Sequence, residues 1–231
     1  MFYRPENGHG LPHDPWNAIV APRPIGWIST RGTQGDNLAP YSFFNATAYV
    51  PPQVMFASTG AKADRDGTKD SVAQIAESRV FCVNIADFAM KDEMNASTAV
   101  HAAGISEFQA AGIASAECDS IDCPRVAGAP ASLECRATRV MRLAGEANWM
   151  VLGVVTGIHI RDDCINADGA FDLRATGWLA RMGYRGDYAR VTETFEMIRP
   201  RASPPAPSRR RSRTISAASP TFPIRGSCSA T

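Results

Sequence analysis

We predict a mainly β protein with α-helical insertions, folded as a closed or nearly closed antiparallel barrel. Three observations lead to this prediction. The chain has 231 residues, of which 45% are apolar and 20% charged, as in a packed globular domain of ordinary size. Short apolar runs rich in Val, Ile and aromatic residues recur along it, separated by turns that contain Gly or Pro. Only brief segments between these runs carry a helical pattern.

The first strands follow an irregular, Pro- and Gly-rich lead-in at 1–17. IGWIST (25–30) predicts a short strand, and RGTQGD (31–36) predicts a turn because it holds two glycines. A second strand begins at Asn37 and meets Pro40. Because proline has no backbone N–H to donate, we expect this strand at a sheet edge or at a bulge.

A corner and a helix follow. Pro51-Pro52 marks the corner, and the strand QVMFAS (53–58) comes directly after it. A polar loop then leads to a helix at 71–78. Asp70 is the predicted N-cap of this helix, with Ser71 as the alternative.

The rest of the domain alternates between strand and helix. RVFCVNIA (79–86) predicts a strand, and the Ala-rich segment 90–112 predicts helix with a break at Gly104. Two long strands are predicted last, at 131–142 and 147–161, and a turn at 144–146 joins them.

The composition changes at about Pro200, which divides a predicted domain at 1–200 from a tail at 201–231. The tail is rich in Pro, Ser and Arg and has no acidic residue, so we predict a basic, disordered tail. The 18 basic and 23 acidic residues that remain leave the domain with a net charge of about −5, which does not suggest a nucleic-acid surface. The abrupt change also raises the hypothesis of a frameshift, which resequencing this end of the coding region would test.

Common nucleotide, metal and hydrolase motifs are absent from the sequence. It has no G-x-G-x-x-G after a strand, no P-loop, no H-E-x-x-H and no G-x-S-x-G. His9 and His13 are separated by Gly10 and Pro12, which prevent a helix, so we predict no metal site.

The six cysteines form no C-x-x-C pair and are expected as buried or idle thiols in a reducing cytosol. Without a secretory pattern or an apolar run of about 18 residues, we expect a cytoplasmic protein with no membrane contact.

Polar residues gather where the strand QVMFAS ends and the next helix begins. Ser58 and Thr59 close the strand, while Lys69, Asp70 and Ser71 stand at the start of the helix. A helix N-terminus offers free N–H groups and a positive dipole end, so together with a lysine and hydroxyls it suits a phosphate dianion. The alternative is that Asp70 and Ser71 only cap the helix while Lys69 is solvated.

His159 lies on the long strand WMVLGVVTGIHI (149–160). Strict alternation would place it on one face with Gly153 and Gly157, which have no side chains. Glycine within a strand often marks the close approach of a ligand, so we expect His159 beside an open patch. The alternative is a satisfied histidine at the rim of the barrel.

The stretch NLAPYSFFN (37–45) carries a proline, aromatic rings and several hydrogen-bonding side chains between strand-like neighbours. It is either a β-corner or the place where a flat ligand lies against the backbone. With its surroundings it resembles the flavin reductase-like family of FMN-binding split β-barrels, over about residues 10–200. A G-x-x-x-G-x-H-I strand and an R-x-G-x-x-x-x-Y element match further along. The resemblance depends on Trp27, Ser29, Thr30, Asn37, Pro40, Tyr41, Ser42, Asn45, Pro51, Pro52, Ser58, Lys69, Asp70, Ser71, Gly153, Gly157, His159, Ile160, Arg181, Gly183 and Tyr188.

This resemblance implies a Greek-key-like antiparallel split barrel that forms a homodimer, with flavin at the subunit interface. Pro40 and Tyr41 would lie against the flavin, and Ser42 and Asn45 would bond the pyrimidine edge of its ring. The phosphate position favours FMN, with FAD possible, and the segment from Arg181 to Tyr188 could complete the pocket from the other subunit. The remaining candidate cofactor-binding residues are Thr30 and Asp70, and for the phosphate Ser58, Thr59, Lys69 and Ser71.

The activity that the resemblance implies is hydride transfer from NAD(P)H to flavin, with the flavin itself carrying the chemistry. His159 would contact the nicotinamide or phosphate as the candidate catalytic residue. The choice between NADH and NADPH stays open, as does a monooxygenase partner that uses reduced flavin. The alternatives are a flavin-binding protein without NAD(P)H oxidation, for storage, electron relay or sensing, and a bound-flavin enzyme that acts on a small organic molecule.

Overall fold

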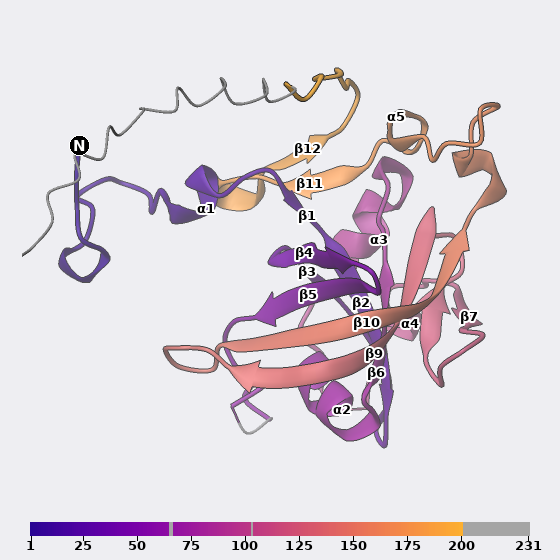
Figure 1. Cartoon of the computed structure of the whole chain (residues 1–231). Helices are drawn as coiled ribbons and strands as arrows, with labels where there is room; N and C mark the ends of the chain where they lie inside the picture. Colours follow the sequence, from indigo (N-terminus) through magenta and orange to yellow (C-terminus); the bar gives the residue numbers. More distant parts are fainter. Residues whose placement is uncertain (65–66, 103, 201–231) are drawn as a thin grey trace, which may run out of the picture. The chain divides into compact units, whose positions relative to one another are not determined.

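The computed structural model describes residues 1–64, 67–102 and 104–200, and its compact unit spans Met1–Thr194. The tail predicted at 201–231 lies outside the described residues. The main element is a seven-stranded antiparallel sheet in the order β3-β2-β6-β9-β10-β5-β4 (Figure 1). Its strands are β2 (Gly26–Gly32), β3 (Gly35–Tyr41), β4 (Phe44–Tyr49), β5 (Pro52–Ser58), β6 (Val80–Asn84), β9 (Ala131–Arg142) and β10 (Trp149–Ile160).

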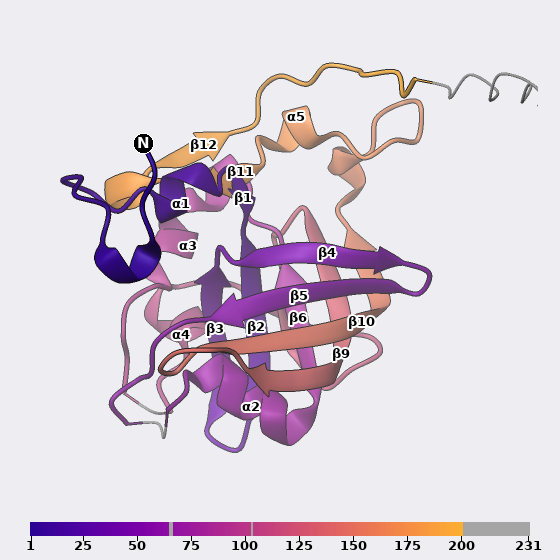
Figure 2. The same ribbon diagram turned by 60° about the vertical axis from the view of Figure 1, so that its left-hand side comes forward.

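The sheet curls so that its two ends approach each other. β3 and β4 lie at opposite ends of the strand order, although only Ser42 and Phe43 separate them in the sequence. The Ala57 N–H donates to the Phe43 carbonyl at 2.7 Å, and the ring centroids of Tyr41 and Phe56 are 4.8 Å apart. Figure 2 shows β4, β5, β10 and β9 crossing in front of β2, β3 and β6. The short connection at residues 42–43, its hydrogen bond to β5 and the packing of Tyr41 on Phe56 therefore hold the two ends together, since no strand pairing links β3 to β4 or β5 in the described part of the chain.

The edge position of β3 confirms what Pro40 predicts. Pro40 pairs with Trp27 of β2 on one side, and β3 has no neighbour on the other side within the described sheet. The strands predicted at 25–30 and 53–58 are confirmed as β2 and β5. The predicted corner at Pro51-Pro52 is the turn of a hairpin, because residues 44–49 form a strand of their own, β4, that pairs with β5.

Large apolar side chains fill the inside of the curled sheet. Phe56, Phe81 and Val151 are fully buried, and the two phenylalanine rings meet edge to face at 5.7 Å. Burying one such side chain stabilises a fold by roughly 1.5–3 kcal/mol. Gly153 of β10 makes room for this core, because a Cβ there would lie 2.6 Å from Cζ of Phe81.

Two small sheets and several short helices complete the unit. The three-stranded sheet contains β1 (Arg23–Pro24), β11 (Leu179–Arg181) and β12 (Tyr188–Arg190), and the two-stranded sheet contains β7 (Ser115–Glu117) and β8 (Pro124–Val126). The α-helices are α1 (Trp16–Ile19), α2 (Asp70–Ser78), α3 (Lys91–Ala96), α4 (Glu107–Ala110) and α5 (Leu173–Thr176). The 3-10 helices are η1 (Pro5–Asn7), η2 (Phe88–Met90), η3 (Asp162–Cys164) and η4 (Tyr184–Gly186). None of the described helices has the length and apolar character needed to cross a bilayer.

The region from residue 90 to residue 112 is less helical than the sequence predicts. Only α3 and α4 form there, and the segment between them is irregular. Ser97 ends α3 because its hydroxyl accepts the indole N–H of Trp27 at 2.9 Å and donates to the Met94 carbonyl at 2.8 Å. Gly104 then adopts a positive φ of 86°, which few other residues would tolerate. These tertiary contacts override the local helix propensity of an Ala-rich segment.

Candidate functional site

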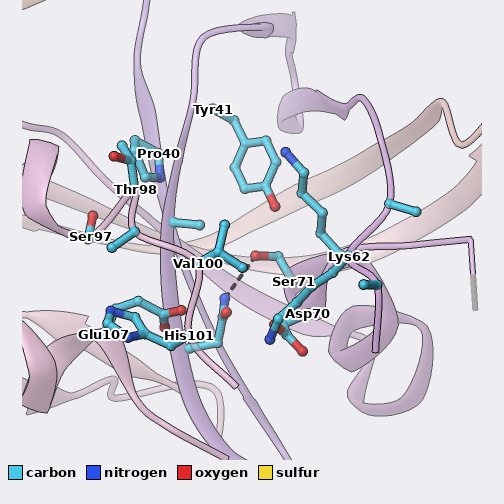
Figure 3. A pocket seen from close by; sticks show the side chains of 16 residues that line it. Pro40, Tyr41, Lys62, Asp70, Ser71, Ser97, Thr98, Val100, His101 and Glu107 are labelled. Carbon is cyan, nitrogen blue, oxygen red and sulfur yellow. Dashed lines mark hydrogen bonds and ion pairs between the residues drawn. The ribbon is translucent and has the colours of Figure 1, made fainter. Parts of the chain in front are cut away.

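A pocket of about 290 Å³ opens beside the edge strand β3. One wall is the start of α2 with the loop before it, and the opposite wall is the irregular segment after α3 (Figure 3). β3 contributes the remaining positions. The lining therefore combines segments that are far apart in the sequence, and it includes the predicted site residues Pro40, Tyr41, Lys69, Asp70 and Ser71.

The helix α2 begins at this pocket without a side-chain cap. The N-cap residue is Lys69, so the prediction that Asp70 caps the helix is wrong. Asp70 is the first helical residue, and its carboxylate pairs with Lys62 Nζ at 2.8 Å. Lys69 Nζ lies 5.9 Å from the centre of the Tyr41 ring, and none of the described acidic residues pairs with it. The first N–H groups of the helix and a lysine thus face the pocket together.

Two buried hydroxyl groups lie near the start of α2. Those of Tyr41 and Ser58 have no hydrogen-bond partner among the described residues. Burial raises the pKa of Tyr41, and the nearby hydroxyls of Ser71 and Ser58 offset part of this rise, so the phenol is a neutral donor at pH 7. Figure 3 shows the Tyr41 hydroxyl directed toward Ser71. Leaving a buried hydroxyl unpaired costs about 1–3 kcal/mol, so the Tyr41 hydroxyl, which lines the pocket, suits the polar end of a ligand.

The opposite wall holds a buried carboxylate. Glu107 of α4 is 7% exposed, and its Oε2 accepts the Leu38 N–H of β3 at 2.9 Å. Burial raises the pKa of Glu107, while the Leu38 N–H and nearby His101 hold part of this rise back. The pocket is therefore cationic at the α2 wall and carries an acid and an imidazole at the other.

The other predicted cofactor-binding residues do not line the pocket. Thr30 is buried in β2 and its hydroxyl donates to Oε1 of Gln74 at 2.6 Å, which ties α2 to the sheet. Asn45 is exposed, and its side-chain oxygen accepts the next N–H of its own strand at 2.8 Å. The guanidinium of Arg181 lies 4.7 Å from the centre of the Tyr188 ring. Their roles toward a cofactor stay predictions, as do those of Ser42, Ser58 and Thr59.

His159 is also absent from the pocket lining and lies against a buried carboxylate instead. Its Nε2 is 2.5 Å from Oε1 of Glu134. The prediction of an open patch beside His159 is wrong. A Cβ on Gly157 would lie 3.2 Å from the Glu134 carboxyl group, and the Phe81 ring fills the space above Gly153. A register shift between Val155 and Gly157 also interrupts the alternation on which that prediction depended.

Glu134 accepts further hydrogen bonds from a neighbouring loop. The N–H groups of Asp119 and Ser120 donate to its two oxygens at 2.6 and 2.7 Å, and the Ser120 hydroxyl donates as well. Burial would raise the pKa of Glu134, but the hydrogen bonds from Ser120, His159 and Asp119 outweigh it and lower the pKa to about 2. Ligand atoms of Asp119, Glu134 and His159 lie within 4.8 Å of one another. Because both Glu134 oxygens are already acceptors, we interpret the group as a clamp on the loop.

Sequence reasoning missed three charged or titratable side chains of the pocket, those of Lys62, His101 and Glu107. Lys62 lies in a polar loop where a lysine is unremarkable, and the other two lie in the segment predicted as helix. The sequence held one signal for Glu107, which is its position next to Phe108 at the start of an apolar turn. An acid that such a turn buries needs a hydrogen-bond partner.

Comparisons with known proteins agree on one family. The profile described as flavin reductase like domain matches residues 20–175. An uncharacterized protein of Deinococcus radiodurans is 40% identical over 190 residues, which cover 79% of this chain and 82% of that protein. Nitrilotriacetate monooxygenase component B from Bacillus cereus is similar in structure, with a TM-score of 0.76 and 24% identity over 85% of this chain and 98% of that one. For the 2-nitrobenzoate 2-nitroreductase of Pseudomonas fluorescens the TM-score is 0.70 and the identity 27%, over 83% and 91% of the two chains.

Proposed function

This chain belongs to the flavin reductase-like family, and from that premise we propose that it is an FMN-binding oxidoreductase that transfers hydride from NAD(P)H to flavin. Its fold is the antiparallel split barrel that the sequence predicts. The family and the structural neighbours support a flavin-related function. The single observation that carries the proposal is the uncapped start of α2, with Lys69 and unpartnered hydroxyls beside it.

The α2 wall fits the phosphate of FMN. A phosphate there would accept N–H groups of the first helical turn and the hydroxyl of Ser71, and Lys69 would neutralise its charge. The buried hydroxyl of Tyr41, which lines the pocket, would gain the acceptor that it lacks among the described residues. Asp70 does not oppose this arrangement, because Lys62 already pairs with it at 2.8 Å. FAD, which carries a phosphate at the same position, is the alternative cofactor.

The edge strand β3 would hold the flat part of the cofactor. In this proposal Pro40 and Tyr41 lie against the isoalloxazine ring, and Ser42 and Asn45 bond its pyrimidine edge. When bound, FMN would supply the hydride acceptor, and the protein would orient the nicotinamide and exclude water. Thr30 acts indirectly here, since its bond to Gln74 holds α2 in place.

We also propose a homodimer in which Arg181 completes the pocket of the partner subunit. Arg181 is half-buried, with its guanidinium 4.7 Å from the centre of the Tyr188 ring, and none of the described acidic residues pairs with it, so its charge is available to a phosphate or carboxylate. Light scattering on the full chain tests the dimer. Component B of a nitrilotriacetate monooxygenase is a structural neighbour, so a monooxygenase that receives reduced flavin is the partner that we propose.

A second candidate is an enzyme that keeps its flavin bound and reduces a small organic molecule. The neighbour that favours it is the 2-nitrobenzoate 2-nitroreductase, which is 27% identical to this chain. Steady-state NAD(P)H oxidation separates the two candidates, because free flavin stimulates a flavin reductase and an organic acceptor stimulates a bound-flavin enzyme.

The first experiment is the visible spectrum of the purified protein, with chromatography of any released flavin and anaerobic addition of NADH or NADPH. We expect FMN absorbance that one of the nucleotides bleaches. Bound flavin that neither nucleotide bleaches would favour a flavin-binding protein for storage, relay or sensing. A protein that takes up neither FMN nor FAD would overturn the site.

A further inference from the structure

Three cysteines meet on the face of the barrel near the two-stranded sheet, outside the pocket. Cys82 of β6 and Cys123 are fully buried and pack together with Val80 and Ile121. Cys118 is half-buried and packs against this group from the surface side. None of the three is in a disulfide. Nothing in the proposed flavin chemistry uses them.

Cys118 and Cys123 face each other across a tight hairpin. In the β7–β8 ladder Ser115 pairs with Val126 and Glu117 with Pro124, so the next position of the same register pairs Cys118 with Cys123. The Cys118 N–H donates to the Cys123 carbonyl at 3.1 Å, which shows that this pairing continues beyond the strands. Directly opposed residues of an antiparallel pair have Cα atoms roughly 4.5–5.5 Å apart, within the span of a disulfide.

The surroundings favour a thiolate at Cys118 and thiols at the other two positions. The neighbouring thiols of Cys123 and Cys82 lower the pKa of Cys118, while the pKa values of both of those residues are raised. An oxygen acceptor also lies near each of these two sulfurs, Asn84 Oδ1 at 3.8 Å from Cys82 and the Ser29 carbonyl at 3.3 Å from Cys123, which favours their protonated forms. A half-exposed cysteine with lowered pKa beside a second thiol is the arrangement of peroxide-reactive sites.

We propose that Cys118 is a peroxide-reactive cysteine and that Cys123 is its resolving partner. The Cys118 thiolate attacks one oxygen of hydrogen peroxide, the O–O bond breaks, and hydroxide leaves, which gives a sulfenic acid. The Cys123 sulfur then attacks the Cys118 sulfur, and the sulfenic hydroxyl leaves as water with the Cys123 proton. Two thiols and one peroxide become one disulfide and two waters, so the thiols are oxidised and the peroxide is reduced.

Cys123 is a better resolving partner than Cys82. The Cys82 backbone is held on both sides, by Ser29 of β2 and by Glu134 of β9, in the middle of the seven-stranded sheet. Cys123 instead lies at the end of a short hairpin, and four residues separate it from Cys118. The two hairpin positions are already opposed, so the bond can close while Glu134 still holds Asp119 and Ser120, whereas β6 cannot shift without breaking two strand pairings.

The test treats the reduced full-length protein with hydrogen peroxide, blocks the remaining thiols, and maps peptides without reduction. Cleavage before Asp119 and Asp122 and after Arg125 puts Cys118, Cys123 and Cys135 on different peptides. We expect a Cys118–Cys123 link. With Cys123→Ser we expect peroxide to form a sulfenic acid, read out by dimedone labelling, roughly tenfold faster at Cys118 than at Cys164, because peroxide oxidises a thiolate far faster than a buried thiol.

Three variants keep the test decisive. Cys118→Ser, at the half-exposed position, should abolish the peroxide-dependent loss of two thiols while the melting temperature stays unchanged. The control Cys164→Ser, at a buried cysteine elsewhere, should leave the link intact, and so should Cys82→Ser. A link from Cys118 to Cys82 or Cys228, or equal labelling of Cys118 and Cys164, would overturn the proposal. Flavin binding plays no part in these readouts, so failure of the proposed function would leave them unchanged.

Discussion

His159 and Glu134 form a close pair on the adjacent strands β10 and β9, with Nε2 of the histidine 2.5 Å from Oε1 of the carboxylate. Glu134 is fully buried, and the Asp119 and Ser120 N–H groups occupy its remaining acceptor positions. The pair thus joins β9, β10 and the loop that leads from Cys118 to Cys123. A buried carboxylate with this many donors is stabilised in its charged form.

We expect this carboxylate to make stability depend on pH in the acid range. The pKa of Glu134 falls from 4.5 to about 2 on folding, so its contribution is fully present above about pH 4.5 and is lost as the pH falls toward 2. Urea unfolding of the wild type and of Glu134→Gln at a series of pH values measures this. The stability difference should shrink across that window, and a difference that stays constant would contradict the assignment.

His159→Ala should act mainly on stability. Removing the ring takes one hydrogen-bond partner from the buried Glu134 carboxylate, and a hydrogen bond to a charged group is worth about 1.5–3 kcal/mol. Because His159 does not line the pocket, FMN affinity should stay within a factor of about 2 of the wild type. A normal melting temperature with much slower NAD(P)H oxidation would instead favour the predicted contact of His159 with the nicotinamide.

Lys69→Ala should weaken binding of FMN but not of riboflavin, which lacks the phosphate. A charge-assisted contact of this kind is worth about 1.5–3 kcal/mol, so the Kd for FMN should rise roughly tenfold or more. Fluorescence titration of both ligands gives the comparison. Lys91→Ala is the matched control, because that lysine pairs with Asp92 outside this pocket. Equal weakening of FMN and riboflavin by Lys69→Ala would place the phosphate elsewhere.

Tyr41→Phe should affect the apo protein and its FMN complex differently. The Tyr41 hydroxyl has no hydrogen-bond partner among the described residues, so its removal should leave the free energy of unfolding of the apo protein unchanged or raise it by about 1 kcal/mol. Affinity for FMN should fall severalfold. The exposed Tyr49→Phe serves as the control and should alter neither quantity. Loss of apo stability with unaltered FMN affinity would show that the hydroxyl serves the fold.

Glu107→Gln should stabilise the apo protein at neutral pH. Folding raises the pKa of Glu107, so the native state favours the protonated form. The free energy of unfolding therefore falls as the pH rises from the ordinary pKa of a glutamate through the raised pKa of the folded state. Glutamine keeps a carbonyl oxygen for the Leu38 N–H but carries no charge. Thermal melts should therefore show a gain over wild type that grows with pH, and the exposed Glu146→Gln should show none.

Residues with strong local constraints made much of the barrel predictable from the sequence. Pro40 required an edge position for β3, because it lacks the N–H that an interior strand would use. Alternating and β-branched runs located β2, β5, β6, β9 and β10, and the spacing of polar groups located the start of α2. The motifs around Pro40, Lys69 and Ser71 were specific enough to indicate the family, and these residues do line one pocket.

The tertiary structure decided what depends on contacts between distant segments. Glu107 and His101 reach the pocket because Ser97 bonds to Trp27 and ends the helix that the local sequence favours. The glycines of β10 admit Phe81 and Glu134 rather than a ligand, since only the packed sheet shows which side chain stands above them. The contact between His159 and Glu134 likewise depends on how the strands of the sheet pair. Backbone preference is a property of a few neighbouring residues, whereas a partner across the sheet is chosen by register and burial, which no local pattern records.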